Sequence, residues 1–125
     1  TGGIAVTAGA IKSNVVSGTP AANTLYTDNT PKGWVMGDTA GNVSASFNVT
    51  SITDNGTGDW SVNWDRDMAS ATYAAVASGK SDGAISTEIG NTSFAAGVTR
   101  VRCWLISTAL AVDPNHFFCM AMGLQ

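Results

Sequence analysis

The stretch VSASFNVTSITDNGTGDWSVNW, Val43–Trp64, contains two alternating segments on either side of a turn. Apolar and polar residues alternate from position 43 to 49 and again from 60 to 64, a period of two that is typical of half-buried β-strands. Between them, Asp54–Asp59 supplies Asn-Gly and a second Gly, which accept the positive φ of a tight hairpin. The stretch predicts a long strand over Val43–Thr53, a hairpin and a second strand. Because Ile52 breaks the alternation, we expect a bulge or bend near Ser51.

Further segments with strand composition occur at intervals of about ten residues along the chain. They are short, rich in Val, Thr and aromatic residues, and bounded by Gly, Asn, Asp or Pro. About eight short strands at this spacing predict an all-β fold, an antiparallel β-sandwich. The other expected strands are Trp34–Met36, Thr72–Ser78, Ala84–Ile89, Thr99–Thr108 and His116–Met122.

The composition excludes several classes of protein. The chain has 125 residues with six Lys and Arg against nine Asp and Glu, a net charge of −3. Few strong helix formers are present beyond Ala, which rules out a helical bundle. The scattered basic residues form no stripe for nucleic acid, and no apolar run approaches the roughly 18 residues of a membrane span. We therefore expect no nucleic-acid partner and no membrane partner.

The first 23 residues differ from the rest of the chain. They are rich in Gly and Ala and contain no aromatic residue, so they can bury little apolar area. We expect residues 1–23 to form an extended arm or an edge strand, and residues 24–125 to form the β-sandwich domain. Because the chain starts without Met, either a start was removed or this is a piece of a longer protein.

The closing segment, His116–Met122, is apolar on both of its faces. An antiparallel strand in a lone domain usually keeps one polar face. Two apolar faces therefore predict either a central position in the sandwich or a place at a subunit interface. The expected interface residues are Phe117, Phe118, Met120 and Met122.

No complete motif of a common catalytic or metal site is matched. There is one Glu and one His, so no pair of glutamates is available. A Gly-x-Ser-x-Gly sequence occurs at Gly79–Gly83, but it lies in an expected polar loop that no helical sequence follows, whereas a nucleophile elbow needs a strand-to-helix turn. The Asp54–Asp59 loop fails the EF-hand pattern, because its third position is Gly56 and its sixth is Asp59. A looser calcium site there stays open beside the simpler interpretation, carboxylates that cap backbone amides. We expect no catalytic residue, no resident metal and no cofactor.

The remaining candidate residues lie in and beside that hairpin. Loops on a rigid sandwich commonly carry recognition, and aromatic rings either bind sugar rings or build the core. For each Trp, packing is favoured over binding. The candidate binding residues are Asp54, Asn55, Thr57, Asp59, Trp60 and Trp64, and the other candidate loops are Gly79–Gly83 and Ala109–Asn115.

The two cysteines, Cys103 and Cys119, both lie in apolar strand segments. If the last two strands paired as a hairpin with the connection centred near Val112, residue 103 would face about residue 121. That arrangement would bring the thiols within about one register step of each other. Because their neighbours are core types, we expect two buried free thiols rather than a disulfide.

Several of these segments resemble a domain found at the C-terminal ends of tailed-bacteriophage fibre and other virion-appendage proteins. The residues that carry the resemblance are Tyr26–Val35 (YTDNTPKGWV), Ser46–Trp64, Met68, Tyr73, Val98–Arg102 (VTRVR) and Gly123. It covers about residues 25–123, and the hairpin is its specific part. The sequence departs from the pattern at Gly33, where Ala is usual, and at Trp34–Gly37.

The resemblance implies a β-rich, non-enzymatic virion domain that forms a homotrimer on the outside of the particle. Its partners would be copies of itself, other virion proteins and a glycan or protein on the host surface. We keep a capsid decoration or head-fibre protein with a stabilising role as the alternative. A depolymerase acting on surface glycans is disfavoured because the sequence has no pair of glutamates and no motif of a metal cluster.

Overall fold

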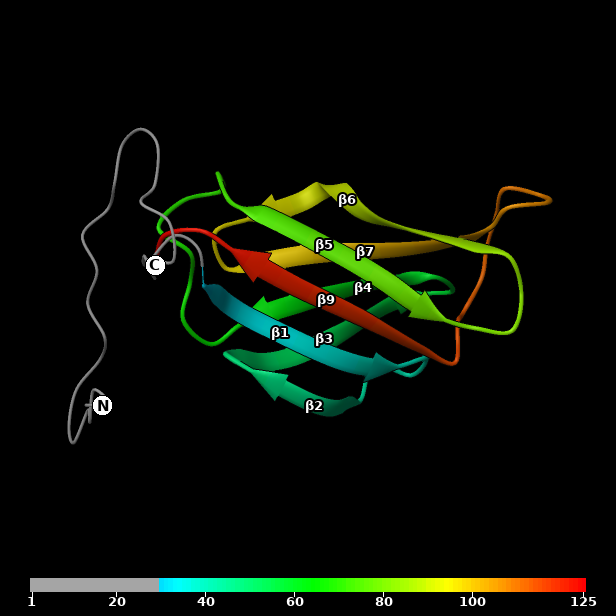
Figure 1. Ribbon diagram of the computed structural model, residues 1–125, viewed down its shortest axis with the longest axis horizontal. Coiled ribbons are helices and arrows are strands. Elements are labelled where there is room, and N and C mark those ends of the chain that lie inside the picture. The colour runs from blue at the N-terminus through cyan, green and yellow to red at the C-terminus, as the bar shows by residue number, and fades with distance from the viewer. Residues whose placement is uncertain (1–29) are drawn as a thin grey trace, which may run out of the picture.

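The computed structural model describes residues 30–125, which form nine β-strands (Figure 1). The expected arm at 1–23 and the first six residues of the expected sandwich domain, 24–29, lie outside the described residues. Within the described part there is no helix, and hence none that could cross a membrane. The strands are β1 (Pro31–Asp38), β2 (Val43–Phe47), β3 (Val49–Gly56), β4 (Asp59–Trp64), β5 (Ala74–Lys80), β6 (Ile85–Ala95), β7 (Val98–Leu105), β8 (Leu110–Ala111) and β9 (His116–Met122).

The strands form two antiparallel sheets that pack face to face, which confirms the expected all-β sandwich. The front sheet, nearest the viewer in Figure 1, has the order β2-β1-β9-β5. The back sheet has the order β3-β4-β7-β6, and β8 pairs with the end of β7. Consecutive strands β1–β2, β3–β4 and β6–β7 are neighbours, as hairpin connections require.

The core lies between the sheets and is built by alternating residues of both. Trp60 of β4 and Phe117 of β9 stack with their ring centroids 4.7 Å apart and are fully buried. The Trp60 indole N–H donates to the carbonyl of Thr39 at 3.2 Å, so this large side chain leaves no polar atom unpaired. Val35, Val62 and other small apolar side chains fill the space around the pair.

A polar cluster closes the other end of the core. The Trp64 indole N–H donates to the hydroxyl of Thr99 at 3.1 Å, and the Tyr73 hydroxyl lies 2.7 Å from that same oxygen. Burial raises the pKa of Tyr73 above its usual value. A methyl group on Gly33 would lie 2.5 Å from the Trp64 ring, so the position of this indole favours Gly at residue 33.

The expected long strand Val43–Thr53 is wrong, because the chain changes sheets within it. Asn48 has a φ of 57° and separates β2 in the front sheet from β3 in the back sheet. Its side-chain amide donates to the carbonyls of Lys32 (2.9 Å) and Arg66 (3.0 Å), and its carbonyl accepts the Arg66 N–H at 2.7 Å. The expected bulge near Ser51 is confirmed by a register shift between Val49 and Ser51.

The expected C-terminal hairpin is also wrong. β7 pairs with β4, β6 and β8 in the back sheet, whereas β9 pairs with β1 and β5 in the front sheet. The Asp113–Asn115 turn therefore carries the chain across the sandwich instead of reversing it within one sheet. Cys103 and Cys119 consequently lie in different sheets, and both are buried free thiols as expected.

Candidate functional site

The outer face of the front sheet carries an apolar row that crosses all four strands. Cross-strand partners place Phe47 of β2 beside Trp34 of β1, Trp34 beside Met120 of β9, and Met120 beside Val76 of β5. Directly paired residues project from the same face of a sheet. We call these four residues the apolar row. Phe47 is 57% exposed, Trp34 41% and Val76 60%, so the row is a surface feature and not part of the core.

A shallow hollow of about 290 Å³ lies toward the β5 side of this face. The outward-facing residues of its lining are Trp34, Met120 and Val76 of the row, together with Phe118 and Ser78 from the next row along the strands. Phe118 is 38% exposed. The hollow is open to solvent, and its outward-facing lining contains one hydroxyl.

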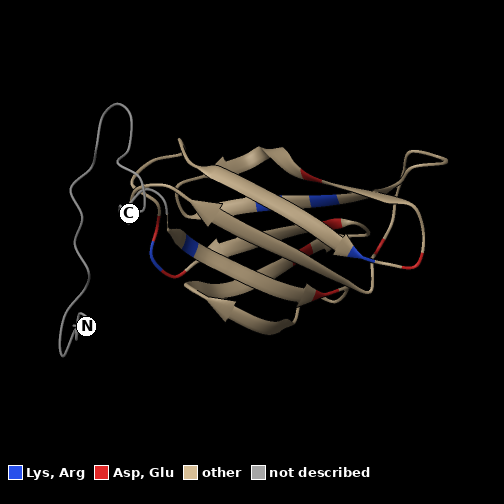
Figure 2. Cartoon of the chain, in the orientation of Figure 1, with Lys and Arg blue, Asp and Glu red and all other residues tan. Residues whose placement is uncertain are grey.

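Charge is confined to the margins of the front sheet (Figure 2). Lys32 lies near the start of β1, and at the other end of the sheet Asp38, His116 and Lys80 are successive cross-strand neighbours. The Asp38 carboxylate accepts the backbone N–H groups of Ala40 and Asn42, and the pKa of Asp38 is lowered mainly by its hydrogen bonds with Asn42. The middle of the face thus has no ionisable side chain.

The outer face of the back sheet is polar and internally hydrogen-bonded. The Asn63 amide donates to the hydroxyls of Ser51 (3.0 Å) and Thr53 (3.1 Å). Farther across the sheet, the Trp104 indole N–H donates to Glu88 at 2.9 Å, and Arg102 lies 4.3 Å from the centre of the Trp104 ring. The two outer faces of one sandwich therefore differ: one is polar and carries several internal hydrogen bonds, although the buried Nε of Arg102 has no hydrogen-bond partner, and the other is apolar.

Asp59, a candidate binding residue, is paired within the chain. Its carboxylate accepts two hydrogen bonds from the Arg100 guanidinium, one of them from Nε at 2.7 Å. These bonds, together with a weaker one from Asn55, hold the pKa of Asp59 below its usual value. The same pairing raises the pKa of Arg100. Asp59 acts as a structural partner of the neighbouring strand rather than as a free acceptor.

The rest of the hairpin loop is also occupied by local contacts. The Asp54 carboxylate accepts the N–H of Gly56 at 2.9 Å, and the Asn55 amide donates to the Ser61 hydroxyl at 2.9 Å. Thr57 lies in the turn between β3 and β4, as expected. Asp54 thus caps a backbone amide, which is the alternative to calcium that the sequence offered, whereas the carboxylate of Asp59 is bound by side chains. Among residues 30–125 no group of three or more His, Cys, Asp and Glu is placed to hold a metal ion.

The three candidate loops meet at one end of the sandwich. Gly58 donates its N–H to the Asp113 carboxylate at 2.6 Å, which joins the β3–β4 turn to the segment before β9. The ends of β5 and β9 are paired there through Lys80 and His116. In Figure 1 this loop end lies on the right, opposite the end at which β1 begins and β9 finishes. The sequence did not predict that these loops would be neighbours.

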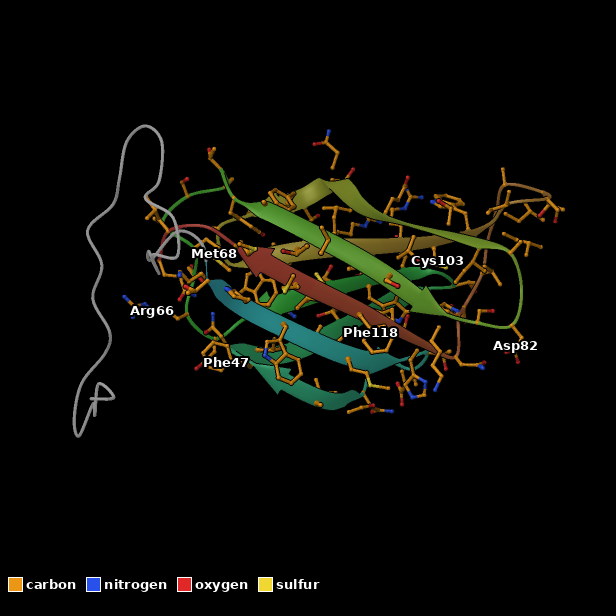
Figure 3. The ribbon with its side chains drawn as sticks, viewed as in Figure 1. Phe47, Arg66, Met68, Asp82, Cys103 and Phe118 are labelled. Carbon is orange, nitrogen blue, oxygen red and sulfur yellow. The ribbon has the colours of Figure 1, made fainter. Side chains whose placement is uncertain are left out.

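The structure removes three expected residues from any exposed site. Trp60 and Trp64 are 0% and 4% exposed, so neither indole offers a surface to a sugar ring, and the binding role suggested for them is wrong. Phe117 is fully buried against Trp60, which leaves Phe118, Met120 and Met122 as the outward-facing members of the β9 set (Figure 3). The sequence missed Phe47 and Val76, because their exposure depends on which sheet each strand joins.

The two thiols contribute no reactive group at the surface. Burial raises the pKa of Cys119 to about 12, and burial also raises the pKa of Cys103.

Comparisons with family models, curated proteins and solved structures give no match. The site that the described residues offer is therefore argued from its own geometry: an uncharged apolar outer face on the front sheet, and a cluster of loops at one end.

Proposed function

We propose that this chain is a non-enzymatic structural domain of a bacteriophage virion, at the tip of a fibre or tail appendage, and that it assembles as a homotrimer. The observation that carries the proposal is the contrast between the two outer faces. A sandwich that worked alone would be expected to keep polar residues on both of its outer faces. An apolar row that ends in Phe47 and Val76 is suited to burial by another protein surface.

The loop end supports a role in recognition. The turns that connect β1 to β2, β3 to β4 and β5 to β6 lie there, together with the segment before β9 (Figure 1). β1 enters the sandwich at the opposite end, so the loop end lies far from Pro31, where β1 begins. A host-surface glycan or protein would then meet loops that are held by a rigid scaffold. The resemblance of residues 25–123 to virion-appendage domains adds the viral setting.

A second candidate, a capsid decoration or head-fibre protein, is favoured by one observation. The polar side chains of the β3–β4 loop are bound to one another and to adjacent strands, as the Asp59–Arg100 pair illustrates. A loop whose polar side chains are already hydrogen-bonded within the chain is better suited to stabilising its own fold than to binding a receptor. In that case the domain would contribute assembly contacts, and soluble protein would not bind host cells.

Three measurements test these proposals. Light scattering after size exclusion should give the mass of three chains, and a monomer at every concentration would contradict the trimer. Antibody raised against the purified chain should label fibres or tails in electron micrographs of the virion, whereas labelling of the capsid would select the decoration role. Labelled protein should bind host cells only if the recognition role is correct.

A further inference from the structure

We propose that the apolar row docks against the front sheet of a second copy of this chain, with Phe47 of one copy seated over Val76 and the adjoining hollow of the next. The inference deepens the proposed self-association and rests on it.

The row is graded in size from one end to the other. Phe47 and Trp34, the two large aromatic residues, occupy the β2 and β1 positions, and Val76, the smallest member, lies at the β5 end beside the hollow. Protein surfaces pack well where a large side chain meets a small one, because the layers then interdigitate without voids. The Phe47 end of one copy therefore fits the Val76 end of another better than it fits a second Phe47.

The exposed apolar area is suited to such a contact. At roughly 150–250 Å² for a large side chain, the exposed fractions of Phe47, Trp34, Val76, Phe118 and Val43 leave on the order of 400 Å² of apolar surface. A standard interface buries about 800 Å² on each partner. Each copy in a ring makes two contacts, one through each end of the row, and the two contacts share this surface. The row therefore supplies about half of the area that one copy contributes to a standard interface, and the neighbouring surface of the edge strands β2 and β5 would have to supply the rest.

The contact joins unlike ends and is therefore heterologous, which produces a closed ring when the rotation between copies allows it. In a trimer whose axis runs along the strands, each copy would give Phe47 to one neighbour and receive Phe47 from the other beside Val76. Strands β2 and β5, the two edges of the front sheet, would lie at the seams. The exposed edges of the sheet would thereby be covered as well.

A second copy fits this face better than a sugar does. A carbohydrate needs several hydrogen-bonding groups beside an aromatic ring, and Ser78 supplies the one hydroxyl among the outward-facing residues around the hollow. The charged groups of the sheet, among them Lys80 and Asp38, lie at its margins. An apolar strip across four strands instead matches an equally apolar strip on another protein surface.

The first experiment uses the full chain and three variants: Phe47→Ser, Val76→Arg and the control Leu110→Ser. Leu110 is 66% exposed in β8, on the back sheet, so its substitution removes a similarly exposed apolar side chain away from the row. Light scattering across a concentration series should show the dissociation constant rising roughly 30-fold or more for Phe47→Ser and Val76→Arg. Leu110→Ser should assemble like the parent chain. Circular dichroism checks that each variant is folded, which the exposure of all three positions favours.

The second experiment detects the contact directly with the double variant Phe47→Cys/Val76→Cys. Within one copy these positions are separated by three strand spacings, about 14 Å, which is too far for a disulfide. The native thiols are buried. Mild oxidation should therefore link copies to one another and give a covalent trimer on a non-reducing gel, whereas each single-cysteine variant should give at most a dimer.

The outcomes separate this contact from the proposed function. If the parent chain is monomeric throughout, the self-association itself is refuted. If the parent chain is a trimer but Phe47→Ser leaves its mass unchanged and the double variant does not cross-link, the contact is refuted and the trimer stands. Loss of assembly in Leu110→Ser would move the interface to β8 and also overturn the contact. A covalent dimer from the double variant would keep the contact and overturn the trimer.

Discussion

Replacing Asn48 tests the point at which the chain passes from the front sheet to the back sheet. Asn48 combines a left-handed backbone, φ 57°, with a side chain that binds Lys32 and Arg66. Asn48→Ala removes all three side-chain hydrogen bonds. It also places alanine in the left-handed region, which its Cβ makes unfavourable. Asn48→Gly removes the same hydrogen bonds, but glycine has no Cβ and adopts the left-handed conformation without a steric cost.

The magnitude of the effect follows from these contacts. The bond to the Lys32 carbonyl is partly buried and contributes about 1 kcal/mol, and the two exposed bonds to Arg66 contribute roughly 0.5 kcal/mol each. The left-handed conformation adds about 1 kcal/mol for Ala. We therefore expect Asn48→Ala to lower the free energy of unfolding by about 3 kcal/mol and Asn48→Gly by about 2 kcal/mol.

The assay is urea unfolding at a single protein concentration, because the stability of an oligomer depends on that concentration. Asn55→Ala is the matched control: it removes an asparagine with two exposed hydrogen bonds but without positive φ, and should cost less than about 1 kcal/mol. A loss below about 0.5 kcal/mol for Asn48→Ala would refute the idea that Asn48 fixes the crossing. Equal losses for Ala and Gly would refute the backbone contribution.

Three further changes test the core, the surface ion pair and the thiols. Gly33→Ala should lower the free energy of unfolding by about 1–3 kcal/mol, because the added methyl would lie 2.5 Å from the Trp64 ring. The same substitution should cost less in a Trp64→Leu background, where the ring is absent. Equal losses of stability in the two backgrounds would contradict the clash. Asp59→Asn should cost about 1 kcal/mol at pH 7. Since the pKa of Asp59 is lowered by Arg100, the difference from the parent should vanish as pH falls through the folded pKa, below about 4, and urea unfolding from pH 7 to pH 3 checks this. At pH 8 Cys119 should resist a thiol reagent until the chain is unfolded, because it is buried with a pKa of about 12, and rapid labelling of the native chain would show that the strand opens.

Local sequence pattern predicted most strands, because a period of two and the turn residues act over short distances. The alternation of Trp60, Val62 and Trp64 placed these side chains on one face, and that face is buried. His116–Met122 was predicted with its observed boundaries. Such features depend on neighbours within a few residues, which is the range over which a single sequence carries information.

The pairing of strands could not be predicted in the same way. The C-terminal segments read as a hairpin, but β7 and β9 belong to different sheets, and no local signal distinguishes a turn within a sheet from a crossing between sheets. The alternation of Val43–Phe47 predicted a buried face, yet every residue of β2 is exposed, because Asn48 redirects the chain after it. The apolar row depended on this pairing. Its members come from four strands, and only the assembled sheet brings Phe47, Trp34, Met120 and Val76 into line.

The uncharged middle of the front sheet also determines how a contact through it would respond to solution conditions. An association that buries apolar groups weakens on cooling and strengthens with excluded salts such as sulfate. Dilute sodium chloride, which screens exposed ion pairs, would have little effect on it. An assembly built through this face would hold its subunits more tightly at about 37 °C than in the cold, and the subunits would be best separated for study on ice rather than by raising the concentration of sodium chloride.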